Sequence, residues 1–541
     1  MKSSLLTFLL IINTVVLAQQ EKPKLVVGIV VDQMRYDYLD RYWNKFGEGG
    51  FKKLVNEGFN CKNTHYNYMP TFTAPGHASI YTGTTPENHG IIANTWYNKK
   101  SKQYLYCTED TTVKTVGSNS ANGLMSPKNL TTTTITDELK LNTNQQGKVI
   151  GISIKDRGAI LPAGHKADAA YWFDGGNEGK WISSTFYMNE LPKWVQGVNN
   201  KNMADKYLNQ PWETLLPISS YTESIVDDNP YEGTFTTEEK PVFPHNLPAL
   251  RDSNENYSLI KATPFGNTIV KEMAIAAIKG EQLGKKGVTD FLAVSFSSTD
   301  YVGHQFGPMS IEVEDTYLRL DKDLEELISF LEKELGKDNI LLFLTADHGA
   351  VNVPQYLMDN HLPAGYFNMK KVAEEIKQKC LDQFGVDSLI SNISNAQVFF
   401  NYEKIEKNKL KQSDIEFFVA SQLLKYEGVV QSYTRTDLMN AQFIDGISGI
   451  VQRGFHQARS GDVLFVLESG WIMSGYTTGT THSSPYQYDT HVPLLWYGKG
   501  ILKGETSQKV VIPDIAATLS ALLNIQAPSA CNGLPIKSIV K

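Results

Sequence analysis

Four long, mostly apolar runs constrain the fold of this chain more than any other feature. They lie at residues 25–31, 149–154, 291–296 and 340–346, and a further run follows His491. The runs are rich in β-branched residues and show no regular alternation of apolar and polar positions. Such runs are typical of strands that are buried on both faces of a parallel sheet.

An amphipathic helix is predicted between the last two of the four runs. Residues 313–336 carry leucines three or four positions apart, with acids and lysines between them, and end in a glycine, a good helix terminator. Strand, helix, strand is the crossover unit of a doubly wound sheet. We therefore expect an α/β fold with a doubly wound, mostly parallel central sheet and helices on both faces.

The N-terminus predicts export. Lys2 precedes an apolar stretch at 5–17, and Val16 and Ala18 are small residues that suit cleavage after Ala18. We expect a signal peptide at 1–18 and a periplasmic or secreted protein. The apolar stretch is too short to span a bilayer comfortably, and no second run of about 20 apolar residues follows, so no membrane span is expected.

The rest of the chain, 19–541, is expected to form one catalytic unit with two irregular insertions. The first, at about 160–270, is rich in Trp, Gly, Asn and Pro, and we interpret it as a cap over the site. The second, at about 355–480, contains one strand-like stretch, "DVLFVLESGWIM". The sequence leaves open the oligomeric state, with which a monomer is compatible, and the pairing of the four cysteines (Cys61, Cys107, Cys380 and Cys531).

Six residues suited to metal binding lie at the ends of the apolar runs or just beyond them. The six are Asp32, Asp300, His304, Asp347, His348 and His491. Asp32, Asp300, Asp347 and His348 follow the carboxyl ends of predicted strands, where ligands gather in parallel sheets, together with Lys155 and Arg157. His304, four residues after Asp300, can share one helical turn with it, and His491 would arrive from far along the chain. Three carboxylates and three imidazoles suit Zn²⁺, with Mn²⁺ or Fe as alternatives. Six ligands are too many for one tetrahedral zinc with an open position, but they suit two metals. Of the other histidines, only His482 is expected near the site.

A hydroxyl nucleophile is predicted at Thr73, within "TFTAPGHAS". A threonine just before a first turn that contains proline is a favoured helix N-cap, and we expect the helix to cover about 77–81. A helix N-terminus favours anions, and a metal can lower the pKa of a hydroxyl placed there. The structural alternative is a cap with no chemical role.

An anion clamp is predicted in "SIKDRGA". If this segment is extended, Lys155 and Arg157 point the same way, because side chains two apart share a face of a strand. Arginine offers a fork for two phosphoryl oxygens and lysine a point charge. Asn94 could add an amide hydrogen bond. The alternative for the two cations is a solvated loop. The net charge of -7 and scattered lysines give no basic patch for nucleic acid.

With these residues identified, the chain resembles the alkaline phosphatase superfamily, and most closely the secreted bacterial PafA-type enzymes that use threonine. The segments that match are "VDQMRYDYL", "MPTFTAPGHASIYTGTTPENHGIIANTWY", "VGISIKDRGAILPAGH", "SSTDYVGHQFGP", "TADHG" and "YQYDTHVPLLWYG". They span nearly the whole mature chain in the family's order.

The resemblance implies two zinc ions per chain and hydrolysis of small phosphate monoesters of many alcohols through a phosphothreonine intermediate. One zinc would bind Asp300, His304 and His491. The other would bind Asp32, Asp347 and His348 and contact the Thr73 oxygen. Thr73 would be the nucleophile. Three further side chains would hold the transferred phosphoryl group: Asn94, Lys155 and Arg157.

Three other functions fit the sequence less well than a phosphomonoesterase does. Sulfatases need Cys or Ser at the position of Thr73 and an arginine four residues later, and here that residue is His77. Nucleotide pyrophosphatase-type diesterases, or phosphonate hydrolases, would share the metal ligands and the threonine, but the diesterase family lacks the pair formed by Lys155 and Arg157. A non-catalytic binder of metal or phosphate is disfavoured because all ligands and the hydroxyl are present.

Overall fold

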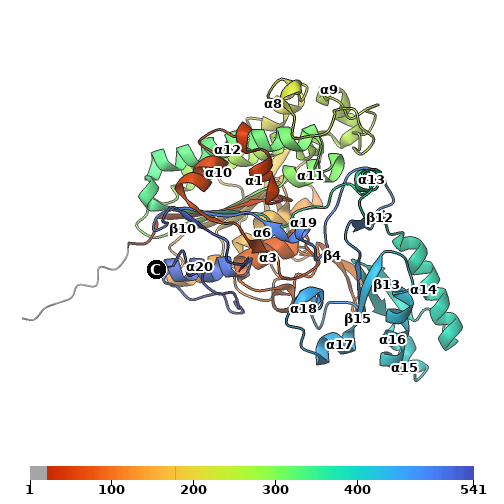
Figure 1. Cartoon of the computed structure of the whole chain (residues 1–541). Coiled ribbons are helices and arrows are strands. Elements are labelled where there is room, and N and C mark those ends of the chain that lie inside the picture. The colour runs from red at the N-terminus through yellow and green to blue at the C-terminus, as the bar shows by residue number, and fades with distance from the viewer. Residues whose placement is uncertain (1–20, 177, 541) are drawn as a thin grey trace, which may run out of the picture.

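The structure, a computed structural model, describes residues 21–176 and 178–540. The predicted signal peptide at 1–18 lies outside these residues. Figure 1 shows a main body, built around one large sheet, and a smaller lobe attached to one side of it. No helix within the described residues has both the length and the apolar character needed to cross a membrane. The four cysteines are all described, and none forms a disulfide.

The central sheet has ten strands, and its middle is parallel as predicted. The parallel strands are, in spatial order, β11 (Ile340–Thr345), β1 (Leu25–Val31), β10 (Asp290–Phe296), β7 (Val149–Ser153) and β8 (Ala169–Asp174). All five are buried along their whole length, which explains their unbroken apolar sequences. The flanking strands that pair antiparallel are β19 (Leu494–Gly498), β2 (Phe59–Cys61), β9 (Lys180–Ser184) and β6 (Thr115–Val116), and β20 (Gly504–Thr506) closes one edge.

Helices cover both faces of the sheet, so the predicted doubly wound α/β fold is confirmed (Figure 1). On one face lie α10 (Phe265–Glu281) and α12 (Ile311–Leu335), and on the other α3 (Thr73–Thr82), α6 (Asp156–Ala163) and α20 (Asp514–Leu523). The helix predicted at 313–336 is α12. The side chain of Ser310 caps it by accepting the N–H of Val313, and Gly336 follows its last turn.

The first expected insertion starts later than predicted. Its first part supplies β8 and β9 to the central sheet, so the irregular stretch begins only after Ser184. Short helices and loops then continue to α10, among them α7 (Lys193–Asn199) and α8 (Met203–Leu208). β8 was not predicted because its run "AAYWFD" contains Trp172 and was interpreted as part of the tryptophan-containing insertion. The role of this stretch as a cap stays a prediction.

The second expected insertion is ordered, and the expectation of an irregular segment is wrong. It forms the smaller lobe, with a sheet in the spatial order β13 (Ile390–Ser394), β14 (Gln397–Phe400), β16 (Val463–Leu467) and β15 (Val429–Thr434). Two helices, α14 (Met369–Phe384) and α16 (Gln412–Leu423), pack on this sheet around an apolar core of their own. The strand-like stretch noted in the sequence forms β16 and β17 (Trp471–Ile472).

Candidate active site

Three neighbouring strands deliver most of the predicted metal ligands to one place. Asp32 follows β1, and Asp347 and His348 follow β11, which pairs with β1. Asp300 lies in the first turn of α11 (Ser298–Phe306), which begins just after β10, the other neighbour of β1. Because these strands are parallel and adjacent, their carboxyl ends lie side by side, as the sequence predicted.

The first ligand group consists of Asp32, Asp347 and His348. Each offers a ligand atom within 4.8 Å of the other two, and all three side chains are fully buried. Among the described residues, three of their buried atoms have no hydrogen-bond partner: Asp32 Oδ1, Asp347 Oδ2 and His348 Nε2. Unpaired buried polar atoms are costly, and two carboxylate oxygens with one imidazole nitrogen are a donor set that suits a divalent cation such as zinc.

The second group consists of Asp300, His304 and His482, again with ligand atoms within 4.8 Å of one another. Asp300 and His304 are one turn apart on α11, and Asp300 Oδ1 lies 3.1 Å from His304 Nε2. His482 completes the group from a loop between β17 and α19 (Gln487–Thr490). This residue was expected near the site but had no assigned role.

His491, which was assigned to this position, does not join either group, and that assignment is wrong. Its ring stacks between Tyr36 and His65, and its Nε2 bonds to the carbonyl of Lys62. The physical reason is that His491 begins β18 (His491–Val492), which pairs with β3 (Thr64–His65). In that pairing the ring of His491 packs against Tyr36 and His65 and not with the two ligand groups.

The three ligand histidines share one hydrogen-bonding arrangement. The Nδ1 of each lies near a backbone carbonyl: His304 near Thr480 at 2.8 Å, His348 near Gly349 at 2.9 Å and His482 near Thr71 at 2.5 Å. A carbonyl can only accept, so Nδ1 carries the proton and Nε2 is left with a free lone pair. Such backbone contacts fix the tautomer and orient metal-ligating histidines.

The two groups are joined through Lys155. Its Nζ lies 2.6 Å from Asp32 Oδ2 and 2.6 Å from Asp300 Oδ2, one carboxylate from each group. Its side chain is 1% exposed. Burial opposes the ammonium charge, but Asp300 and Asp32 together raise the pKa of Lys155. A single buried cation thus balances two of the three carboxylates.

The ionisation of the remaining ligands also favours cation binding. Burial, reinforced by the charge of Asp32, raises the pKa of Asp347 well above its usual range, which marks a carboxyl that lacks a counter-charge. Burial lowers the pKa of His348 to about 3 and holds the pKa of His482 well below its usual value. Both rings are therefore neutral at ordinary pH, the form that ligates a metal.

Thr73 lies at the start of α3, and this first turn meets the first group at His77, whose Nδ1 lies 3.4 Å from Asp347 Oδ2. Thr73 is the first residue of the helix, and Phe72 is its N-cap. The prediction that Thr73 caps a helix beginning near 77 is therefore wrong, because the helix begins a few residues earlier, at Thr73 itself. Pro75 is compatible with the earlier start because the first turn needs no N–H donor from it. His77 anchors this turn, with one ring nitrogen 2.9 Å from the Thr73 carbonyl and the other 2.9 Å from Ser295 Oγ.

The predicted anion-binding residues are positioned in a different way from that expected. Residues 156–163 form α6 and not an extended segment, so Lys155 is the N-cap of this helix and Arg157 lies in its first turn. Arg157 is held by Tyr106, whose hydroxyl accepts from Nη1 at 3.0 Å and donates to Asp156 Oδ1 at 2.6 Å. Asn94 accepts the N–H of Ala74 through Oδ1 at 2.8 Å, which leaves its amide nitrogen available beside Thr73.

Two functional candidates escaped the sequence reasoning. Gln33 links the groups, because its backbone N–H donates to Asp347 Oδ1 at 3.1 Å and its side chain donates to Asp300 Oδ1 at 2.8 Å. Its position directly after Asp32 was the only available signal. Tyr106 lies in β5 (Gln103–Tyr106), far along the sequence from Arg157, and carried no signal at all.

Known proteins resemble this chain over most of its length. A family model described as type I phosphodiesterase / nucleotide pyrophosphatase matches residues 26–492. Alkaline phosphatase PhoV of Synechococcus elongatus is 48% identical over 96% of this chain and 93% of that protein. Alkaline phosphatase PafA of Elizabethkingia meningoseptica is 46% identical over 96% and 95%, and a Myroides odoratus protein named calcium-transporting ATPase is 46% identical over the same shares. The crystal structure of wild-type PafA matches with a TM-score of 0.93 and 46% identity, over 96% of this chain and 99% of that one.

Proposed function

The chain belongs to the type I phosphodiesterase / nucleotide pyrophosphatase family, within the alkaline phosphatase superfamily, and from that premise we propose that it is an exported alkaline phosphatase. In this proposal it hydrolyses phosphate monoesters of many alcohols. The single observation that carries the proposal is the pair of ligand groups, joined by Lys155, next to the first turn of α3, which begins at Thr73.

Phosphate monoesters are the substrate class that the charge of the site favours. A monoester dianion has one more charged oxygen than a diester, and it gains most from positive groups. Lys155 is a buried cation, Arg157 is a half-buried one, and the amide nitrogen of Asn94 adds a neutral donor. Fixed donors in a buried site stabilise charge on the transferred group without reorganisation. The alcohol is not needed for these contacts, which supports broad specificity.

We propose zinc as the metal, with two ions per chain. Asp32, Asp347 and His348 would hold one ion, near the Thr73 oxygen. Asp300, His304 and His482 would hold the other. When bound, the ions supply Lewis acidity that lowers the pKa of a hydroxyl and neutralises charge on a departing oxygen.

The chain's own residues account for the first chemical step. Thr73 Oγ loses its proton and forms a bond to phosphorus as the ester P–O bond breaks. The leaving oxygen takes the electron pair of that bond, and with one proton, the equivalent of that lost by Thr73, it departs as the alcohol. Asn94, whose Oδ1 accepts the N–H of Ala74, can donate its amide nitrogen to a phosphoryl oxygen. Arg157, held by Tyr106, and Lys155 meet the charge on those oxygens.

Hydrolysis of the phosphothreonine completes the cycle. A water oxygen bonds to phosphorus, the bond to Thr73 Oγ breaks, and phosphate leaves while Thr73 regains its proton. Protons compete with metals for carboxylates and imidazoles, so activity should favour alkaline pH.

Substrate preference and a nucleophile variant test this function together. We expect the purified enzyme to hydrolyse p-nitrophenyl phosphate far faster than bis-p-nitrophenyl phosphate. We expect Thr73→Ala to lose at least about 10³-fold in kcat, because a nucleophile cannot be replaced by the remaining groups. Elemental analysis should find about two zinc ions per chain, and chelation should remove activity that added zinc restores.

A diesterase is the second candidate, because the matched family model is named for phosphodiesterases. A strong preference for the diester would assign the chain to that activity instead. ATP belongs in the same substrate panel, given the name of the Myroides relative. Turnover of Thr73→Ala within a few-fold of the parent would refute the covalent route for either substrate class.

A further inference from the structure

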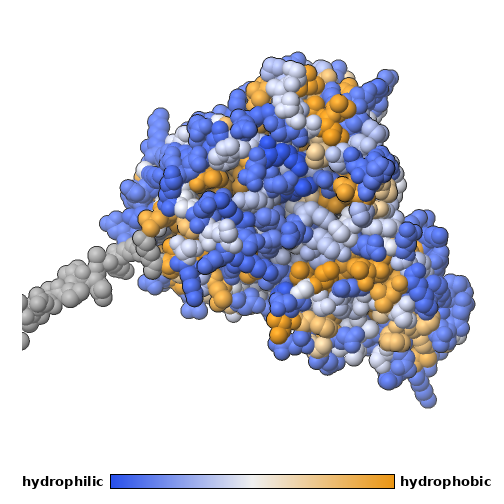
Figure 2. All heavy atoms as spheres, in the orientation of Figure 1, coloured by the Kyte–Doolittle hydropathy of each residue, from blue (hydrophilic) through white to orange (hydrophobic). Residues whose placement is uncertain are grey.

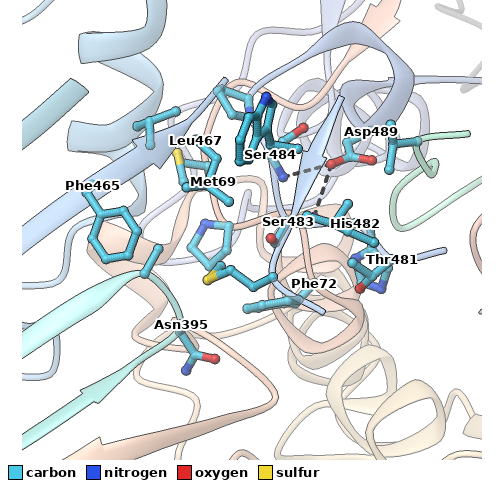
Figure 3. A pocket seen from close by; sticks show the side chains of 18 of the residues that line it. Met69, Phe72, Asn395, Phe465, Leu467, Thr481, His482, Ser483, Ser484 and Asp489 are labelled. Atoms are coloured by element: carbon cyan, nitrogen blue, oxygen red, sulfur yellow. Dashed lines mark hydrogen bonds between the residues drawn. The ribbon is translucent and has the colours of Figure 1, made fainter. Parts of the chain in front are cut away.

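A cavity of about 390 Å³ lies where the smaller lobe meets the main body, next to the proposed reaction centre. Its lining comes from three places: the segment before α3, the strands β16 and β17 with their neighbours, and the loop at 481–489 that carries His482. Figure 3 shows Phe465 and Leu467 on one side of the cavity, and Thr481, His482, Ser483 and Ser484 on the other.

The lining is apolar, and sulfur and aromatic rings dominate it. Three methionines and four aromatic residues contribute: Met69, Met369, Met473, Phe72, Phe465, Trp471 and Tyr488. Asp489 is the only acidic residue among the described residues that line the cavity, and its Oδ2 is occupied by the backbone N–H groups of Ser483 and Ser484. Figure 2 shows apolar side chains gathered on the side of the smaller lobe that faces the main body.

Phe72 and His482 form the wall of this cavity on the side of the proposed reaction centre. Phe72 packs edge-on against the ring of His482, with centroids 5.7 Å apart. The same two segments are joined by His482 Nδ1 to the Thr71 carbonyl at 2.5 Å, and by the Thr71 hydroxyl to the Ser484 carbonyl at 3.3 Å. None of Thr73, Asn94, Lys155 or Asp300 is among the described residues that line the cavity. An occupant therefore touches the back of the reaction centre and not the substrate phosphate.

We propose that this cavity binds a small, neutral aromatic molecule, which changes the turnover of the enzyme without competing with phosphate. The aromatic class follows from the lining, since thioethers and aromatic rings make favourable contacts with an aromatic ring and methionine side chains adapt to its shape. Neutrality follows from the described lining, which holds no lysine or arginine to attract an anion and whose one carboxylate, Asp489, already accepts two backbone N–H groups.

Two residues that line the cavity, Phe72 and His482, are directly connected to the proposed reaction centre. Phe72 is the N-cap of α3, so a displacement of its ring shifts Thr73, the next residue. His482 belongs to the second ligand group and stacks on His348 of the first at 3.4 Å. A molecule wedged against both rings therefore changes the relative positions of the nucleophile and the ligand groups. An effect on kcat is expected, with little effect on KM.

Indole is a suitable probe, because it is neutral and fits a cavity of this size. We expect calorimetry on the metal-loaded enzyme to show one indole per chain. We expect the same affinity with and without saturating inorganic phosphate, since phosphate lies on the other side of the wall. Displacement of indole by phosphate, or no binding at millimolar indole, overturns the proposal.

Matched methionine variants locate the binding. Met473→Trp places a large ring in the cavity. It should weaken indole binding at least about tenfold, because the new side chain fills space that indole would occupy. Met439→Trp, the same change at a position of the smaller lobe that is 47% exposed, should leave it unchanged. Leu467→Phe is a milder filling variant for use if Met473→Trp fails to fold. Unchanged affinity in a folded filling variant rejects the cavity as the site.

The effect on turnover rests on the proposed function, whereas the binding does not. With glycerol phosphate as substrate and phosphate release as the readout, indole should change kcat at least twofold in the parent and not in the filled variant. Binding at the cavity with unaltered kcat refutes the coupling through His482 and Phe72. Binding in a protein without phosphatase activity instead refutes the proposed function and leaves the site standing.

Discussion

His348 and His482 stack face to face, with ring centroids 3.4 Å apart and planes 13° apart. One belongs to the ligand group that includes Asp32, and the other to the group that includes Asp300. The stack and the bridge made by Lys155 thus tie the two groups into one unit. A change in either imidazole is expected to affect both groups.

The first prediction separates His482 from His491. We expect His482→Ala to bind about one zinc per chain in place of two. We also expect kcat/KM to fall roughly 10²-fold or more, because the loss of a metal ligand should reduce activity at least as much as the loss of a group that orients a ligand. His491→Ala should keep both ions and nearly full activity, since its ring contacts Tyr36, His65 and a backbone carbonyl. Elemental analysis and kinetics measure both. If His491→Ala lost zinc and activity while His482→Ala kept both, His491 would be the ligand, as assigned from the sequence.

The second prediction concerns the contact between α3 and the segment of Asp347. A Cβ on Gly76 would lie 2.5 Å from the Asp347 carbonyl oxygen and 2.7 Å from its Cβ. Gly76→Ala should therefore push α3 away, costing about 2 kcal/mol of stability and lowering kcat. Gly197→Ala is the matched control, because a Cβ there meets nothing within 4 Å, and this helical position should gain about 0.5–1 kcal/mol. Chemical denaturation and kcat of both variants give the test.

The third prediction concerns Tyr106 as a positioning residue for Arg157. Tyr106→Phe removes the acceptor of Nη1, and such a loss costs about 1–2 kcal/mol, or roughly tenfold in kcat/KM for a monoester. Diester hydrolysis should fall less, because a diester has fewer charged oxygens to hold. Tyr104→Phe, on the same strand but 56% exposed, should change neither rate. Equal losses on both substrates would assign Tyr106 a purely structural role.

The fourth prediction concerns stability at alkaline pH. His245 lies between Glu238 Oε1 at 2.7 Å and Glu312 Oε1 at 3.2 Å. Burial opposes its charge, but these two carboxylates raise the pKa of His245 to about 9. Because the pKa of His245 is raised in the folded state, its protonation stabilises the fold fully below about pH 6.5. This stabilisation is lost as the pH rises through about 9. The difference corresponds to about 3 kcal/mol, or about 3 °C in Tm for a chain of this size.

A matched pair of glutamate variants checks that assignment. Glu238→Gln removes one partner of His245, so the fall of Tm with pH should begin at lower pH than in the parent. Glu239→Gln, at the neighbouring exposed position, should follow the parent curve. Tm measured at intervals from pH 6 to pH 10 gives the answer, and identical curves for both variants would exclude His245 as the titrating group.

The sequence determined most of the fold because its signals were local. Continuous apolar runs can only be satisfied by strands covered on both faces, and β1, β7, β10 and β11 occur where those runs lie. The leucines of α12 repeat at helical spacing, which depends on neighbours three and four residues away. For the same reason Asp32, Asp300, Asp347 and His348 were predicted together, since each follows a strand end that the sheet topology places at one edge.

Only the tertiary structure decided between His482 and His491, and how Lys155 and Arg157 are arranged. Both histidines stand in the same stretch after β17, and nothing local distinguishes them. The choice depends on the pairing of β18 with β3 and on the contact of His482 with Thr71, each between segments more than 400 residues apart in the chain. Likewise α6 replaced an extended segment because Tyr106 and Asp156 hold Arg157 in a helical first turn. Side-chain direction is set by such distant contacts, and a pattern of neighbouring residues carries no information about them.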